Sequence, residues 1–192
     1  MNKFIYIILI FFIFINSAKT DDIKDFQIEG VSVGDSLLNS MEKKYLNDNK
    51  KYFSSTNFGV KKEYSWIYLE TNKLSNYDAV RIYFKSSDKK YFVQNIAGYK
   101  YFQNDIASCK SFKSSLINDV EQIATDFIKK EYPYYELKGT DGTRDMTVFS
   151  FKDTSAIKLI CYDYKLDEYI DRFTLSLGSP DWRDFQLNRS HK

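Results

Sequence analysis

Residues 77–101 read YDAVRIYFKSSDKKYFVQNIAGYKY, and their pattern indicates two strands of a β-sheet. Apolar and polar side chains alternate through Tyr77–Lys85, which is the period-two pattern of a half-buried strand. The polar loop Ser86–Lys89 leads into a second strand, expected over Lys90–Tyr101. Strands joined by so short a loop pair antiparallel, because a parallel pair needs a crossover of about a dozen residues or more.

Two helices are expected in addition to the strands. The longer one covers about Ile106–Glu131, because apolar residues recur there every three or four positions, and Pro133 ends it. The shorter one begins at Asp35 or Ser36, whose side chains can accept hydrogen bonds from the free N–H groups of a first turn. It ends at Asn47–Asn49. Four more strands are expected over Lys62–Thr71, Met146–Phe151, Ala156–Tyr164 and Arg172–Leu177.

The resulting order is helix, three strands, helix, three strands. Short strands joined by tight turns predict an α+β fold, a two-layer sandwich in which an antiparallel meander sheet has two main helices packed on one face. No low-complexity or Pro-rich linker divides the chain after its first residues. We therefore expect a single domain over residues 19–192.

The N-terminal segment 1–18 has the pattern of a signal peptide. Lys3 precedes the unbroken apolar run Phe4–Ile15, and small residues lead to a cleavage site expected after Ala18. A helix of that run rises about 18 Å, which is short of a hydrocarbon core about 30 Å thick. We expect a periplasmic or secreted protein without a stable membrane anchor after cleavage; the alternative is an uncleaved anchor.

The charges of the mature chain nearly balance. The full sequence has 28 basic and 26 acidic residues, and removing Lys3 with the signal leaves 27 and 26. Such a balance does not favour nucleic acid as a partner. One His and scattered carboxylates match no metal-binding spacing, and the seven Gly residues form no phosphate-binding loop, so we expect neither metal nor cofactor.

The two cysteines, Cys109 and Cys161, are expected to form a disulfide. Cys109 lies on the apolar stripe of the longer helix, and Cys161 shares a strand face with Ile157 and Leu159. If that helix packs on that face, the two thiols meet in the core, and an oxidising compartment would join them. The alternatives are two free thiols or half of a zinc site.

One segment raises the question of catalysis. Gly34–Leu37 spells the GDSL signature of SGNH-type esterases, in which the serine is the nucleophile and a C-terminal Asp-x-x-His pair activates it. Here His191 is present, but Asn188 stands where the Asp should be. That family also has a parallel sheet. We therefore interpret Asp35 and Ser36 as helix caps and expect no catalytic residue.

An aromatic stripe is the candidate binding surface. Tyr64, Trp66 and Tyr68 alternate along one strand and share a face. Such a stripe could contact a ligand or a partner, and the alternative is that it forms the core side of a half-buried strand.

The segment Phe26–Leu38 resembles the start of small exported proteins of uncharacterised function from AT-rich marine alphaproteobacteria. More loosely, a Gly-containing turn before a helix and a meander resembles periplasmic modules of the BamE and beta-lactamase-inhibitor type, which are binding proteins. These resemblances imply an exported, non-enzymatic binding or accessory module whose partner is an envelope protein or a small apolar ligand. The alternatives are a small serine esterase using Ser36 and a carrier of an apolar ligand between helix and sheet.

Overall fold

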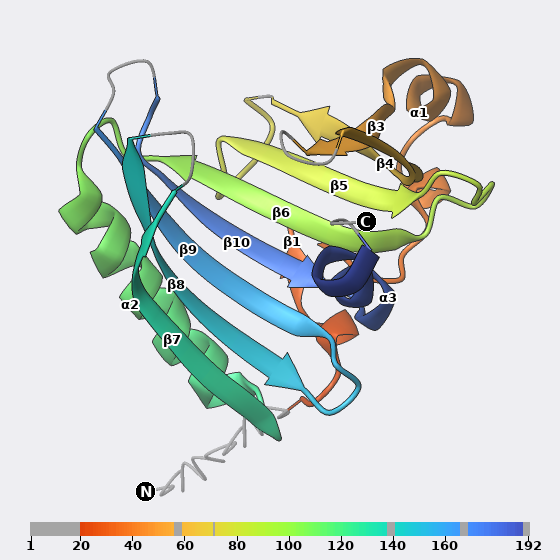
Figure 1. The fold of residues 1–192 in the computed structure, drawn as a ribbon. Coiled ribbons are helices and arrows are strands. Elements are labelled where there is room, and N and C mark those ends of the chain that lie inside the picture. Colours follow the sequence, from red (N-terminus) through yellow and green to blue (C-terminus); the bar gives the residue numbers. More distant parts are fainter. Residues whose placement is uncertain (1–19, 56–58, 71, 138–140, 166–168, 190–192) are drawn as a thin grey trace, which may run out of the picture.

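A computed structural model describes residues 20–55, 59–70, 72–137, 141–165 and 169–189. The expected signal peptide therefore lies outside the described residues. The α+β class and the antiparallel sheet are confirmed: eight strands form one main sheet in the order β3-β4-β5-β6-β10-β9-β8-β7, and all neighbours pair antiparallel (Figure 1). The strands are β3 (Lys51–Ser55), β4 (Gly59–Leu69), β5 (Ala79–Lys85), β6 (Val93–Tyr101), β7 (Phe127–Glu136), β8 (Gly142–Phe151), β9 (Ala156–Tyr164) and β10 (Arg172–Gly178).

Two meanders of four strands each build this sheet. Strands β3 to β6 form the first meander and β7 to β10 the second, and the two join where β6 pairs with β10. In that central ladder Tyr101 lies opposite Arg172, and Asn95 lies opposite Gly178. The last strand of each meander is thus buried in the middle of the sheet, and the first strand of each forms an edge.

The two faces of the sheet have separate cores. The long helix α2 (Ile106–Ile123) covers one face, to which the short helix α1 (Lys43–Asn49) also contributes a buried leucine, Leu46. Helix α3 (Pro180–Asp184), continued by a π-helical turn over Phe185–Arg189, lies on the opposite face, as Figure 1 shows. The remaining elements are the 3-10 turns Ile23–Asp25 and Leu37–Asn39 and the small hairpin of β1 (Gln27–Ile28) and β2 (Val31–Ser32).

The turn of that small hairpin is hydrogen-bonded to the loop between β4 and β5 of the main sheet. Glu29 and Gly30 both have positive φ, 52° and 77°, as a tight two-residue hairpin turn requires. The Glu29 carboxylate accepts hydrogen bonds from the backbone N–H groups of Ser75, Asn76 and Tyr77 at 2.9, 2.7 and 3.2 Å. The N-terminal segment is therefore fixed to the loop between β4 and β5.

The longer helix is shorter than the sequence pattern predicts. It ends at Ile123, and the expected last turns belong to β7, the edge strand that begins at Phe127. The ring of Phe127 packs on that of Phe149 of β8, with 4.9 Å between centroids, so its apolar character serves a strand and not a helix. Pro133 falls where the β7–β8 register shifts, a place where an edge strand tolerates a residue without N–H.

The first expected helix is also different. Ser36 begins only a 3-10 turn, and α1 starts later, at Lys43. Two further elements were not expected from the sequence: β3, which follows α1 directly, and α3 in the C-terminal tail. The sequence does contain a start signal for α3. Ser179 caps the helix by accepting a hydrogen bond from the Trp182 N–H, and Pro180 occupies its first turn.

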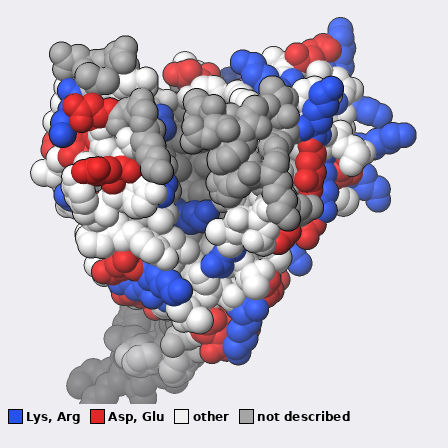
Figure 2. Space-filling model, viewed as in Figure 1, with Lys and Arg blue, Asp and Glu red and all other residues white. Residues whose placement is uncertain are grey.

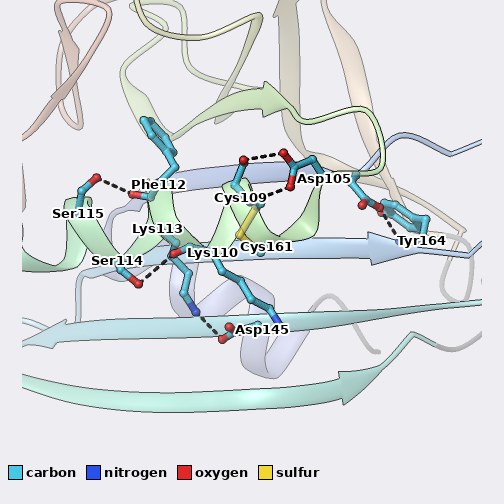
Figure 3. The surroundings of a disulfide bond; sticks show 12 residues. Asp105, Cys109, Lys110, Phe112, Lys113, Ser114, Ser115, Asp145, Cys161 and Tyr164 are labelled. Atoms are coloured by element: carbon cyan, nitrogen blue, oxygen red, sulfur yellow. Dashed lines mark hydrogen bonds and ion pairs between the residues drawn. A yellow bond between two sulfur atoms is a disulfide. The ribbon is translucent and has the colours of Figure 1, made fainter.

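Helix α2 is attached to the sheet by a covalent bond and a partly buried ion pair. The structure contains the Cys109–Cys161 disulfide, with 6.0 Å between the two Cα atoms, and both residues are fully buried (Figure 3). One helical turn further on, Lys113 forms an ion pair with Asp145 of β8. Among the described residues, no helix is both long and apolar enough to cross a membrane.

Replacing both cysteines, Cys109→Ala with Cys161→Ala, should lower the free energy of unfolding by about 4 kcal/mol, because the bond closes a loop with a sequence separation of 52. Urea denaturation with and without reductant measures this. Reductant should destabilise the wild type and leave the double variant unchanged. Two thiols that alkylate freely in protein purified under oxidising conditions would contradict the pairing.

Candidate functional site

A row of arginines and aromatic rings crosses the face of the sheet on which α3 lies. We call this surface the α3 face. Alternation along the strands places these side chains opposite the α2 layer, since chain neighbours such as Ile67, Val80 and Phe173 are buried in the other core. The members of this arginine–aromatic row are Trp66 and Tyr68 of β4, Arg81 of β5, Tyr99 of β6, Arg172 of β10, Tyr162 and Tyr164 of β9, Arg144 of β8 and Tyr135 of β7.

Each guanidinium of the row lies over at least one ring. Arg81 lies 4.5 Å from the ring centre of Trp66 and 5.6 Å from that of Tyr99. Arg172 lies 5.7 Å from Tyr99 and 5.0 Å from Tyr162, and Arg144 lies 4.5 Å from Tyr135. Cation–π contacts therefore continue from the first meander across the β6–β10 junction into the second.

Within the described part of the chain, no carboxylate neutralises the positive charge of the row. None of the ion pairs between described residues includes Arg81, Arg144 or Arg172. The Nε atoms of the same three arginines are buried and have no hydrogen-bond partner among the residues that the structure describes. Burial raises the pKa of Tyr68 and of Tyr99 above the ordinary value for tyrosine, so these two hydroxyls stay protonated and supply no negative charge.

A cavity of about 440 Å³ lies between this row and α3. Its apolar wall includes Met146, Val148 and Ile160, and its basic side chains are Arg144, Lys158 and Arg183. The described residues that line it include no Asp or Glu. Figure 2 looks onto this face and shows Lys and Arg atoms inside and around the hollow.

Lys158 is the most unusual group of the cavity. It extends from β9, and its amino group donates a hydrogen bond of 2.8 Å to the Gln186 side-chain oxygen. Burial, together with the positive charges of Arg183 and Arg144, lowers the pKa of Lys158 to about 8. Buried polar groups in proteins are normally paired, yet the hydroxyl of Thr174, which also lines this cavity, has no hydrogen-bond partner in the described ranges.

The three residues of the expected aromatic stripe differ in burial, although Trp66 packs against the same α3-face core cluster as Tyr64. Tyr64 is fully buried under α3, with its ring 5.0 Å from that of Trp182 and 4.6 Å from that of Phe185. Trp66 and Tyr68 are half-buried and begin the arginine–aromatic row. The first residue thus has the core role that was the alternative, and the other two lie at the candidate site.

The hydroxyl of Ser36 is part of a turn. It lies 3.4 Å from the Leu38 N–H, which it caps, and donates to the Lys90 carbonyl oxygen at 2.7 Å. The Asp35 carboxylate accepts from the Ser32 N–H at 2.8 Å. His191 lies outside the described residues, and among the described ones no group of three or more His, Cys, Asp or Glu could hold a metal ion.

The arginines of the row were missed from the sequence, although one signal pointed to them. Only five of the 28 basic residues are Arg, and three of these five are Arg81, Arg144 and Arg172. Although most basic residues of the chain are Lys, the positions on the α3 face of strands β5, β8 and β10 carry Arg. Arg stacks on aromatic rings and binds anions with two parallel hydrogen bonds, which Lys cannot do.

Comparison with known proteins gives little further information. No protein-family model and no curated protein matches the chain. Among solved structures, the chain is similar to cyanobacterial PsbP (CyanoP) from Synechocystis sp. PCC 6803, with 12% sequence identity over 72% of this chain and 85% of that chain, and a TM-score of 0.33. A likeness of this degree supports no conclusion about fold or function.

Replacing Ser36 by Ala should lower the free energy of unfolding by about 1 kcal/mol, because the turn loses its cap and its bond to Lys90. Thermal melts of Ser36→Ala and of the exposed control Ser87→Ala measure this. Hydrolysis of a chromogenic acetate ester by the wild type that disappears in Ser36→Ala would contradict the capping role and favour the esterase.

Replacing Lys158 by Met should raise the free energy of unfolding at pH 7 by up to about 3 kcal/mol, since the folded chain holds this charge at a cost. The pKa of Lys158 is lower in the folded chain than the ordinary 10.5, so the unfolded chain binds more protons between about pH 8 and 10.5. The free energy of unfolding of the wild type therefore rises between about pH 8 and 10.5. Its difference from that of Lys158→Met becomes smaller over the same range. Urea titrations at pH 7, 8, 9 and 10 check this; a destabilised variant at pH 7 would show that Lys158 is structural.

Proposed function

We propose that this protein is an exported, non-enzymatic binding module whose α3 face binds an anionic component of the cell envelope. The observation that carries the proposal is the arginine–aromatic row, in which three guanidiniums lie on one face without a carboxylate partner among the described residues. Half-buried cations destabilise a folded chain unless they are paired, so an external anion is the partner that fits them.

The rings of the row add a second kind of contact. Trp66, Tyr68 and Tyr162 are rigid and half-buried, and they offer flat surfaces with few rotatable bonds to a bound molecule. Together with the guanidiniums, they favour an anionic ligand over the purely apolar ligand that the sequence also allowed. The space between α2 and the sheet, where a carrier would hold its cargo, is filled by buried side chains such as Phe149, Leu159 and Phe173.

Two features support export. The apolar run Phe4–Ile15 after Lys3 has the pattern of a signal sequence. The Cys109–Cys161 disulfide is typical of a compartment outside the cytosol. The anionic polymers and acidic molecules of a cell envelope are then the ligands that the α3 face would encounter.

Low-mass dextran sulfate is a suitable probe for this face, with uncharged dextran as the ligand control. Both tryptophans of the chain, Trp66 and Trp182, lie on the α3 face, so intrinsic fluorescence reports binding there. The double variant Arg81→Gln with Arg172→Gln should bind dextran sulfate at least about tenfold more weakly than the wild type, because it loses two cations of the row. Calorimetry supplies the affinities.

The matched control removes the same charge elsewhere. Lys43→Gln with Lys44→Gln takes two exposed positive charges from α1 and should change the affinity by less than about twofold. Circular dichroism and a thermal melt establish that both double variants are folded. Arg172→Lys keeps the charge but not the planar stack, and its affinity should fall as well. Equal losses in the two double variants would mean non-specific attraction and would overturn the proposal.

A further inference from the structure

We propose that the cavity between β8, β9 and α3 is a binding site for a small organic anion, whose acidic group lies at Lys158 and Arg144 and whose body lies on the apolar wall. This inference rests on the proposed function of the α3 face and assigns a small-molecule site to its cavity, which shares Arg144, Tyr99 and Tyr162 with the arginine–aromatic row. The arginines tested above, Arg81 and Arg172, do not line this cavity, so the two sites can be tested separately.

The composition of the cavity fits an amphipathic anion. Its apolar side chains, Met146, Val148 and Ile160, come from neighbouring strands, and its basic side chains come from β8, β9 and α3. A volume of about 440 Å³ is within the range of small-molecule sites, which are mostly apolar with a few convergent polar groups. The unpaired Thr174 hydroxyl and the unpaired Arg144 Nε give such a ligand two further hydrogen-bonding groups.

Lys113, a buried lysine on the other face of the sheet, is a useful comparison because its charge has a carboxylate partner. Lys113 of α2 is as deeply buried as the core around it and forms an ion pair with Asp145. Lys158 instead has a neutral partner, Gln186, and two cations near it, Arg183 and Arg144. The charge of Lys158 thus lacks the compensation that Lys113 has, and a bound carboxylate would supply it.

The protonation of Lys158 should couple to binding. Its surroundings contain Arg144 of β8, Arg183 of α3 and the phenols of Tyr83, Tyr99, Tyr132 and Tyr162, and no carboxylate among the described lining residues. With a pKa of about 8, Lys158 is mostly protonated at pH 7 and mostly neutral at pH 9. A ligand that requires the protonated amine should bind about tenfold more weakly at pH 9 than at pH 7.

The test is isothermal titration calorimetry of the wild-type chain with three probes at pH 7. They are 2-naphthoate, which has a ring body and a charge, 2-naphthamide, which has the same body without the charge, and inorganic phosphate, which has charge without the body. We expect 2-naphthoate to bind at least about tenfold more tightly than either of the others, since a charge-assisted hydrogen bond and an apolar contact then act together. Equal affinity for the amide would show an apolar pocket, and equal affinity for phosphate an inorganic-anion site; either result overturns the proposal.

Lys158→Met provides the residue-level test, with the exposed Lys44→Met as its matched control. The first should weaken 2-naphthoate binding at least about tenfold at pH 7 and abolish the pH dependence, and the second should leave both unchanged. At pH 8.5, titrations in two buffers of different ionisation enthalpy should show proton uptake by the wild type and none by Lys158→Met. Lys158→Met that is folded and binds 2-naphthoate like the wild type would overturn the assignment.

The two proposals fail in distinguishable ways. Loss of dextran sulfate binding in Arg81→Gln with Arg172→Gln, combined with no 2-naphthoate binding by the wild type, would retain the binding face and reject the cavity site. The reverse combination would reject the row as the binding surface and retain the cavity.

Discussion

The pairing of β6 with β10 makes one continuous sheet out of the two meanders. Each of these strands is the last of its own meander, and their ladder joins the two halves into one sheet. It places Thr174 opposite Tyr99 and Arg172 opposite Tyr101, so side chains of the two halves meet on the α3 face. Gly98 shows how tightly this region is built, because a Cβ there would lie 2.6 Å from the Tyr77 ring. Without this register the arginine–aromatic row would be two unconnected patches.

The two faces of the sheet are stabilised in different ways. On the α2 face, apolar packing, the Cys109–Cys161 disulfide and the paired Lys113 make a dense structural layer. On the α3 face, α3 covers one part of the sheet with Trp182 and Phe185, and the other part holds cations that form no ion pair with a described carboxylate. Stability that the first face supplies can therefore offset the cost of half-buried charge on the second, a common arrangement at binding sites.

The sequence predicted what local periodicity determines. Alternation in residues 77–101 and 156–164 located strands, and the convergence of two faces paired Cys109 with Cys161. The prediction from periodicity is wrong where tertiary contacts determine the secondary structure. Phe127 has the spacing of a helix residue, but it lies in β7 and its ring packs on Phe149 of the neighbouring strand β8. The row itself depends on sheet order. The scarcity of Arg singles out Arg81 and Arg172, but nothing local to either residue indicates that their strands are separated by only one other strand.

The most direct test of the central claim is an NMR titration that observes the side-chain Nε–H groups of the arginines as low-mass dextran sulfate is added. The buried, unpaired Nε groups of Arg81, Arg144 and Arg172 should all shift as the probe binds, while the backbone amides of α2 on the opposite face stay in place. Shifts confined to α2 or α1, with the three arginine signals unchanged, would show that the arginine–aromatic row is not the binding surface.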